Sequence, residues 1–108
     1  MIRGDIYRVR RPPGNDPKRS RCFVVVSRQP LIDSKAARII CAPINSTSVG
    51  LATQVPVGIE DGLKHASCIN CDQLFTLDKA VLTDFVGTLS PATLRLLRAA
   101  LRVALAVE

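Results

Sequence analysis

The feature that most constrains this chain is its division into short β-branched segments by proline and glycine. Runs of Val, Ile and Thr only a few residues long alternate with Pro, Gly and Asn through most of residues 4–89. β-branched residues favour extended backbone, and Pro and Gly interrupt regular structure. One segment differs, because leucines recur at helical spacing at Leu94, Leu97, Leu101 and Leu105. The chain is therefore predicted to be mainly β, with one C-terminal helix.

The β segments predict roughly five to seven short strands. The clearest are residues 4–10, 22–27, 37–43, 52–57, 66–71 and 85–89. Pro43 is expected to end its strand, and Pro56 suits a strand at the edge of a sheet. Short strands joined by Gly- and Pro-containing loops favour a small β-barrel over an α/β sheet.

The segments between the strands are expected to be turns and short helices. Residues 29–35 are expected to be a connection, Asp61-Gly62 a turn, and residues 78–82 a short helix with Asp78 as its cap. Ser90 followed by Pro91 is a strong start signal for the last helix, which should run to about Ala106. Its leucines should face the core, and solvent is the expected environment of Arg95, Arg98 and Arg102.

Size and composition indicate a single domain, residues 1–108. The chain is 47% hydrophobic but only 4% aromatic, without Trp, so its core must consist mainly of Val, Ile, Leu and Ala. No uncharged apolar stretch reaches the roughly 18 residues that a membrane span needs. The N-terminal residues also lack the apolar region of a signal peptide. We therefore expect a cytoplasmic protein with reduced thiols.

Positive charge is concentrated near the N-terminus. The formal net charge is +6, and residues 1–21 contain seven Arg and Lys against two Asp. The most basic stretch, residues 11–20, also contains three prolines, a glycine and an asparagine, which predicts a loop. Such a segment is a plausible surface for phosphate groups, although a solvated basic loop is the alternative interpretation.

The four cysteines do not form a convincing zinc pattern. Cys68 and Cys71 form a C-x-x-C pair, but only one such close pair is present. Residues three apart in a strand point to opposite faces, which opposes joint ligation. Cys22 and Cys41 lie in apolar runs and are interpreted as small core residues. Packing is favoured, and a metal site or a disulfide remain alternatives, so no metal or other cofactor is predicted.

Two segments could together carry chemistry on RNA. Arg21 stands at the mouth of a buried strand, where its planar guanidinium suits a phosphate and the extra charge of a phosphorane transition state. The polar run Asn45, Ser46 and Thr47 offers amide and hydroxyl groups at another strand end. Such groups would suit metal-free cleavage, in which a 2′-OH attacks the adjacent phosphate. The lone His65 could act as a base, but a solvated loop histidine is the commoner situation.

Several short motifs, taken in order, resemble the MazF/PemK family of toxins. Each motif is short, but their shared order and spacing extend from Arg3 to the last helix. The matching segments are Arg3-Gly4-Asp5-Ile6-Tyr7, Gly14-Asn15-Asp16, Arg21, Phe23-Val24-Val25-Val26-Ser27, Ala42-Pro43-Ile44-Asn45-Ser46, Asp72-Gln73, Thr76-Leu77-Asp78-Lys79 and Gly87-Thr88-Leu89-Ser90.

This resemblance implies a fold, an activity and partners. The fold would be an SH3-like β-barrel that forms a homodimer. The activity would be that of a type II toxin, a sequence-specific, metal-independent and ribosome-independent endoribonuclease that cleaves single-stranded mRNA. The partners would be RNA and a cognate antitoxin, whose acidic C-terminal tail would lie across the RNA groove at the dimer interface.

The resemblance also implies site residues. The family's catalytic Arg corresponds to Arg21, whereas its catalytic Thr corresponds to Asn45, with Ser46 and Thr47 as neighbouring hydroxyls that could replace it. Cys22 stands where the family usually has Pro, and Phe75 where many members have Arg. For the RNA, the predicted base readers are Asn15, Asp16 and Gln73, and the predicted phosphate contacts are Lys18 and Arg19.

Two alternative functions follow from the same residues. The Asn45 departure leaves open a catalytically weakened member that acts by binding RNA or antitoxin only. A gyrase poison on the same barrel, as in the CcdB relatives, is the other alternative. The lack of Trp in the chain and the sequence Ala106-Val107-Glu108 at its end argue against a gyrase poison.

Overall fold

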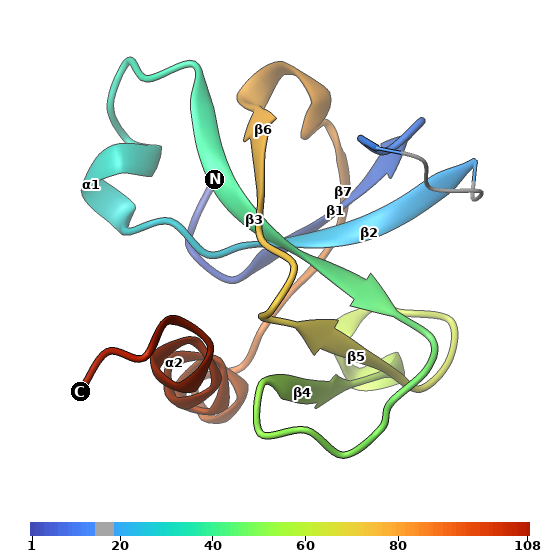
Figure 1. Cartoon of the computed structure of the whole chain (residues 1–108). Helices are drawn as coiled ribbons and strands as arrows, with labels where there is room; N and C mark the ends of the chain where they lie inside the picture. Colours follow the sequence, from blue (N-terminus) through green and yellow to red (C-terminus); the bar gives the residue numbers. More distant parts are fainter. Residues whose placement is uncertain (15–18) are drawn as a thin grey trace.

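The computed structural model describes residues 1–14 and 19–108 and shows a bent sheet with one long helix beside it (Figure 1). The strands are β1 (Asp5–Arg10), β2 (Ser20–Val25), β3 (Arg38–Asn45), β4 (Gln54–Val57), β5 (Ser67–Asn70), β6 (Phe75–Asp78) and β7 (Asp84–Thr88). The helices are α1 (Gln29–Ile32) and α2 (Pro91–Leu105), with short 3-10 turns at η1 (Ile59–Asp61) and η2 (Lys79–Val81).

All strand pairs in the sheet are antiparallel, and the order is β4-β5-β3-β2-β1-β7, with β6 also paired to β3. Strand β3 connects the two parts of the sheet, because its first half pairs with β2 and β6 and its end pairs with β5. The predicted mainly β fold with a C-terminal helix is confirmed. Strand β4, which contains Pro56, lies at one end of the order, as the proline predicted.

The sheet is buried on both faces in its centre. Alternate side chains of β2 enter two different hydrophobic clusters, so Val24 packs in one, and Phe23 and Val25 pack in the other. All three are at most 1% exposed. The first cluster lies under α2, which contributes the fully buried Leu97. This two-sided burial explains why the β2 sequence is a continuous apolar run rather than an alternating one.

Helix α2 begins as the sequence predicts. The Ser90 hydroxyl accepts a hydrogen bond from the Thr93 backbone N–H at 3.2 Å, and Pro91 takes the first helical position. The prediction that all four leucines face the core is wrong for Leu105, which is 57% exposed.

Two local predictions need correction, whereas residues 29–35 connect β2 to β3 as predicted and include the single helical turn α1. Strand β3 does not end at Pro43 but continues to Asn45. Asp78 takes the predicted N-cap position of η2, but its side chain makes no capping hydrogen bond. Its carboxylate instead forms an ion pair with the Arg38 Nε at 3.0 Å, because these two residues face each other across β3 and β6. Among the residues described, no helix is both long and apolar enough to cross a membrane.

Candidate nucleic-acid interface

The candidate site lies where β3 leaves β2. The two strands pair as far as Phe23↔Pro43, and the next residue of β3, Ile44, pairs with β5 instead. Proline has no N–H, so Pro43 cannot donate to a neighbouring strand. Strand β3 therefore diverges from β2 beside Arg21, whose other side pairs with Val9 of β1. The divergence opens a space in the sheet next to a cationic residue.

The side chain of Arg21 extends across this divergence. Its Nη1 donates a hydrogen bond to the Ile44 carbonyl oxygen at 3.2 Å and another to the Asn45 Oδ1. Two acceptors on one neighbouring strand restrict the orientation of the guanidinium. Because the Asn45 oxygen accepts from Arg21, the donor that this amide presents is its Nδ2 group. The fold thus places Arg21 and Asn45, both predicted site residues, in direct hydrogen-bond contact.

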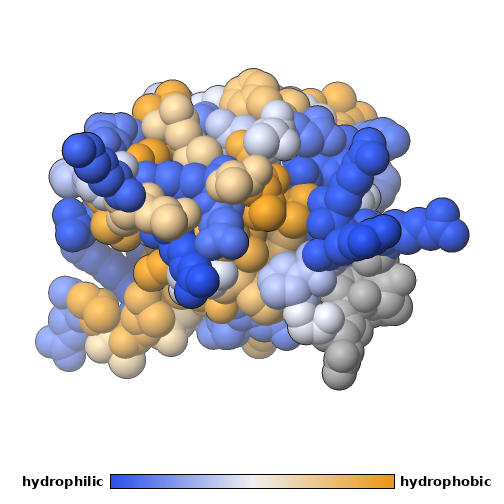
Figure 2. All heavy atoms as spheres, turned by 90° about the horizontal axis from the view of Figure 1, so that it is seen from above, coloured by the Kyte–Doolittle hydropathy of each residue, from blue (hydrophilic) through white to orange (hydrophobic). Residues whose placement is uncertain are grey.

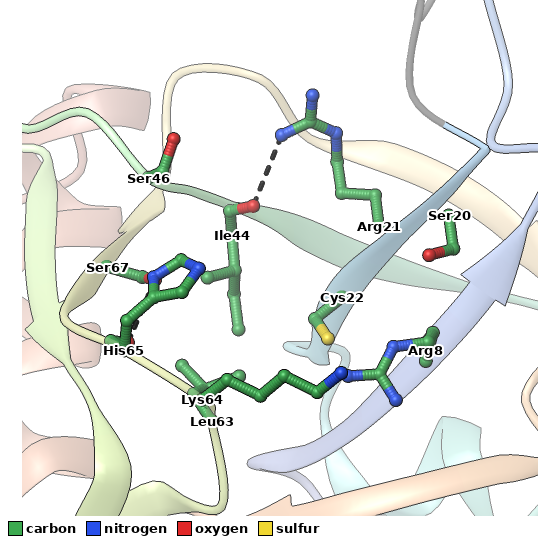
Figure 3. A pocket seen from close by; sticks show the side chains of 10 residues that line it. All are labelled: Arg8, Ser20, Arg21, Cys22, Ile44, Ser46, Leu63, Lys64, His65 and Ser67. Carbon is green, nitrogen blue, oxygen red and sulfur yellow. Dashed lines mark hydrogen bonds between the residues drawn. The ribbon is translucent and has the colours of Figure 1, made fainter.

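A pocket of about 230 Å³ opens beside this pair (Figure 3). It is lined by Arg8, Ser20, Arg21, Cys22, Ile44, Ser46, Leu63, Lys64, His65 and Ser67. Three of these residues are cationic, three carry hydroxyl groups, and no carboxylate is among the described residues of the lining. Such a lining attracts an anion and offers it hydrogen-bond donors.

Arg8 and Cys22 form the part of the pocket between β1 and β2. They face each other in the strand register, and the Arg8 side chain hydrogen-bonds to the Cys22 thiol. Burial raises the pKa of Cys22, and the positive charge of Arg8 partly opposes this effect. The interpretation of Cys22 as a core residue is therefore only half right. Its side chain packs against the first hydrophobic cluster but remains half-buried at the pocket.

Lys64 and His65 reach the pocket from the connection between η1 and β5. The His65 Nδ1 lies 3.2 Å from the Ala66 carbonyl oxygen and 3.4 Å from the Ser67 hydroxyl. Figure 3 shows the imidazole at the pocket, with one ring nitrogen beside Ser67 and the other turned away from it. No local sequence signal predicts this placement, because the β3–β5 pairing is what brings His65 to the pocket that Arg21 also lines.

The structure separates the three members of the polar run. Asn45 contacts Arg21, and Ser46 lines the pocket. Thr47 is not part of the described lining, and its carbonyl oxygen accepts a hydrogen bond from the Cys68 thiol at 3.2 Å. Of the two hydroxyls proposed as replacements, only that of Ser46 is therefore close to Arg21.

The two predicted RNA-binding residues that the structure describes, Arg19 and Gln73, do not line the pocket. Arg19 is exposed next to the start of β2, where its carbonyl oxygen accepts from the Arg11 N–H at 2.8 Å. Gln73 is exposed in the β5–β6 turn, and its Oε1 accepts from the Asn70 side chain at 3.3 Å. Neither residue lines the described pocket. The predictions for Asn15, Asp16 and Lys18 lie outside the described residues.

The cysteines are free thiols in this structure. Cys41, Cys68 and Cys71 are at most 1% exposed, which agrees with a packing role. Burial raises the pKa of Cys41 to about 12, and burial with the nearby Asp72 charge raises that of Cys71 to about 11. Within residues 1–14 and 19–108, no group of three or more His, Cys, Asp or Glu side chains could hold a metal ion.

The fold and the pocket define a small basic protein with a bent antiparallel sheet, a cationic strand junction and a C-terminal helix. A family model described as "PemK-like, MazF-like toxin of type II toxin-antitoxin system" matches residues 2–105. The chain is also similar to the endoribonuclease MazF3 of Mycobacterium tuberculosis, with 31% identity over 71 residues, which cover 66% of this chain and 68% of that protein. The chain therefore belongs to the PemK/MazF family of toxins.

Solved structures agree with this assignment. The Mycobacterium tuberculosis toxin MazF-mt6 has a TM-score of 0.82 at 25% identity, over 96% of this chain and 98% of that one. A mycobacterial endoribonuclease in complex with its cognate antitoxin has a TM-score of 0.84 at 27% identity, over 100% and 97% of the two chains. The predicted family and the predicted barrel with its C-terminal helix are thus confirmed.

Proposed function

We propose that this toxin is a metal-independent endoribonuclease that cleaves single-stranded mRNA at specific sequences without the ribosome. The observation that carries this proposal is the hydrogen-bonded pair of Arg21 and Asn45 at the edge of a cationic pocket. The scissile phosphate would bind in this pocket, and the 2′-OH of the preceding nucleotide would attack it. The products would be a 2′,3′-cyclic phosphate and a 5′-OH end.

The charges and donors of the pocket suit this reaction. A phosphorane transition state carries more negative charge on its oxygens than the ground state. Arg21 is already oriented by the Ile44 carbonyl, so its guanidinium needs little reorganisation to stabilise that charge. Lys64 adds a cation from the opposite side of the pocket. Cationic side chains that are already oriented stabilise the negative charge that develops in the transition state. The reaction would therefore need no metal ion.

Asn45 acts in this proposal as a hydrogen-bond donor, in place of the family's threonine. Its Oδ1 is bound by Arg21, so the Nδ2 group can donate to a phosphate oxygen. An amide cannot transfer a proton at neutral pH, and the role is therefore positioning and charge stabilisation. Ser46 supplies the hydroxyl at the pocket.

We propose further that the toxin works in the cytoplasm as a homodimer and is neutralised by an antitoxin with an acidic tail. A mycobacterial relative of 27% identity was solved in complex with its cognate antitoxin. The net charge of +6 suits an acidic partner as well as RNA. Large exposed apolar side chains, among them Phe85 and Leu96 at 57% and 53%, are available for contact between subunits. Light scattering of the purified chain measures the subunit number.

The test is incubation of the purified toxin with a long single-stranded RNA in EDTA, followed by mapping of the new ends. Discrete cuts with 2′,3′-cyclic phosphate or 3′-phosphate ends are the expected result, and they reveal the recognised sequence. Arg21→Ala, purified in the same way, controls for contaminating ribonucleases.

A binding-only toxin is the second candidate, and the observation that favours it is Asn45 in place of a hydroxyl residue. Intact RNA after incubation with folded protein would overturn the nuclease proposal and support this candidate. Asn45→Thr would then be the decisive variant, because it restores the family's residue beside Arg21. Cleavage gained only by Asn45→Thr identifies the amide as the cause of inactivity.

A further inference from the structure

The reaction proposed above needs a group that takes the proton from the attacking 2′-OH. The pocket contains few groups that can do so. Arginine stays protonated in proteins, and serine hydroxyls are too weakly basic at neutral pH. Burial raises the pKa of Cys22, so its thiol stays protonated, and the Asn45 amide is not a base. Lysine is cationic at neutral pH and equally unsuited.

We propose that His65 is the general base of this site and accepts the 2′-OH proton on its Nε2. This inference rests on the proposed nuclease function and adds a residue to it. Among the described residues of the lining, His65 is the only one whose side-chain type gains and loses a proton near neutral pH. It is also the only histidine in the whole chain.

The hydrogen bonds around the ring determine which nitrogen is basic. The Nδ1 lies 3.2 Å from the Ala66 carbonyl oxygen, which can only accept, so Nδ1 carries the proton in the neutral ring. The Ser67 hydroxyl donates to the His65 carbonyl oxygen at 3.2 Å and so does not compete for that role. Nε2 is then the lone-pair nitrogen, and the ring nitrogen away from Ser67 faces the pocket between Ile44 and Lys64 (Figure 3).

The step is balanced by solvent water. The 2′ oxygen forms a bond to phosphorus while its proton passes to the His65 Nε2, and the bond from phosphorus to the 5′ oxygen breaks. The leaving 5′ oxygen takes a proton from water. The imidazolium returns its proton to solvent once the cyclic phosphate has left, so no proton is gained or lost overall.

The charged side chains that line the pocket around His65 are cationic. Arg8 of β1 and Arg21 of β2 line the same pocket, and Lys64 precedes His65 in its own segment. Asp84 on β7 carries a carboxylate opposite Arg8 in the strand register, close enough to Cys22 to influence its thiol. These cations attract the phosphate of the substrate, whose negative charge would then lie beside the ring that receives the proton.

The experiment compares the wild type with His65→Gln and His65→Arg, using a short oligonucleotide with one ribonucleotide at the mapped cut. Single-turnover rates are measured in EDTA from about pH 5 to 9, the range in which an imidazole titrates. We expect the wild-type rate to fall towards acid. Both variants should lose about 10²- to 10⁴-fold in rate and no longer show this acidic limb. Lys35→Gln, which removes an exposed cation outside the pocket, should leave the profile unchanged.

Several outcomes would overturn the role of His65. Wild-type activity in His65→Gln would overturn it, because no base would then be needed at this position. Wild-type activity in His65→Arg would also overturn it, because a positive charge alone would then suffice. A 5′-phosphorothiolate substrate, whose leaving group needs no proton, should not rescue His65→Gln, and rescue would identify a general acid instead. Binding of the 2′-deoxy oligonucleotide should be equal in wild type and His65→Gln, whereas lost binding would indicate a binding role. If the wild type itself leaves RNA intact, the nuclease proposal fails as well.

Discussion

The two halves of strand β2 follow one another in sequence but have different environments. Phe23 and Val24 pair with strands on both sides, Val25 pairs with β3, and all three side chains are buried. The first half of β2 pairs with β1 but not with β3, and its residues Ser20, Arg21 and Cys22 are half-buried. One continuous strand thus anchors the core at one end and presents the candidate site at the other.

The comparison shows how a small protein can hold a cationic side chain rigidly at its surface. The buried half of β2 fixes the backbone, and the divergence of β3 at Pro43 provides space for the Arg21 side chain. The carbonyl oxygen of Ile44 then accepts from the guanidinium. Substitutions in the buried half of β2 should therefore change mainly the stability of the fold, and substitutions at the junction with β3 should change mainly the activity.

The largest effect on stability is expected from Phe23→Ala. Phe23 is 1% exposed, and its ring packs edge-to-face against Phe75 with 5.8 Å between ring centroids. Removing it should lower the free energy of unfolding by about 3–5 kcal/mol, because a cavity remains in the core. Urea denaturation measures this loss. Ile59→Ala is the control at a side chain that is 73% exposed, and an equal loss there would contradict the proposed difference.

Arg21→Ala should have the opposite signature, with lost activity and a retained fold. We expect the cleavage rate to fall by at least about 10²- to 10³-fold, the usual effect of removing one preoriented transition-state donor. The circular dichroism spectrum and urea midpoint should change little. Arg28→Ala, which removes an exposed cation beyond the other end of β2, is the matched control. Full activity of Arg21→Ala would refute the assignment of Arg21.

The polar run should show a graded response that follows the geometry. Asn45→Ala removes the partner of Arg21 and should lower the rate more than about tenfold, or roughly 1.4 kcal/mol of barrier. Ser46→Ala should have a smaller effect, and Thr47→Ala the smallest, since Thr47 does not line the described pocket. Rates within tenfold of the wild type for all three variants would show that the run is not catalytic.

The stability of the protein at alkaline pH should depend on the buried thiol of Cys41. Cys41 pairs with Val25, and burial raises its pKa from 9.0 to about 12. A raised pKa means that the folded state disfavours the thiolate, so this contribution is complete below pH 9.0 and is lost as the pH rises towards 12. The loss is at most about 1.4 kcal/mol per pH unit. Denaturation from pH 8 upwards should show a shallower decline for Cys41→Ala than for the wild type, and parallel declines would contradict this account.

Much of the fold could be predicted because its determinants are local. The β-branched run of β2, the edge position indicated by Pro56 and the Ser90-Pro91 start of α2 all express backbone preferences of single residues or close neighbours. The errors arose where a long-range contact competed with a local signal. Asp78 pairs with Arg38 on another strand instead of capping its own turn, and β3 continues past Pro43 because β5 takes over the pairing.

The mainly β class, the C-terminal helix, the excess of positive charge and the resemblance to the toxin family could all be recognised before the fold was known. These properties follow from residue types and their spacing, which do not depend on tertiary contacts. The meeting of particular polar groups, in contrast, depends on the fold. The register of β2 and the divergence of β3 place Arg21 against Asn45, and the β3–β5 pairing brings His65 to the same pocket. Contacts between residues far apart in sequence depend on strand pairing, which no local preference specifies.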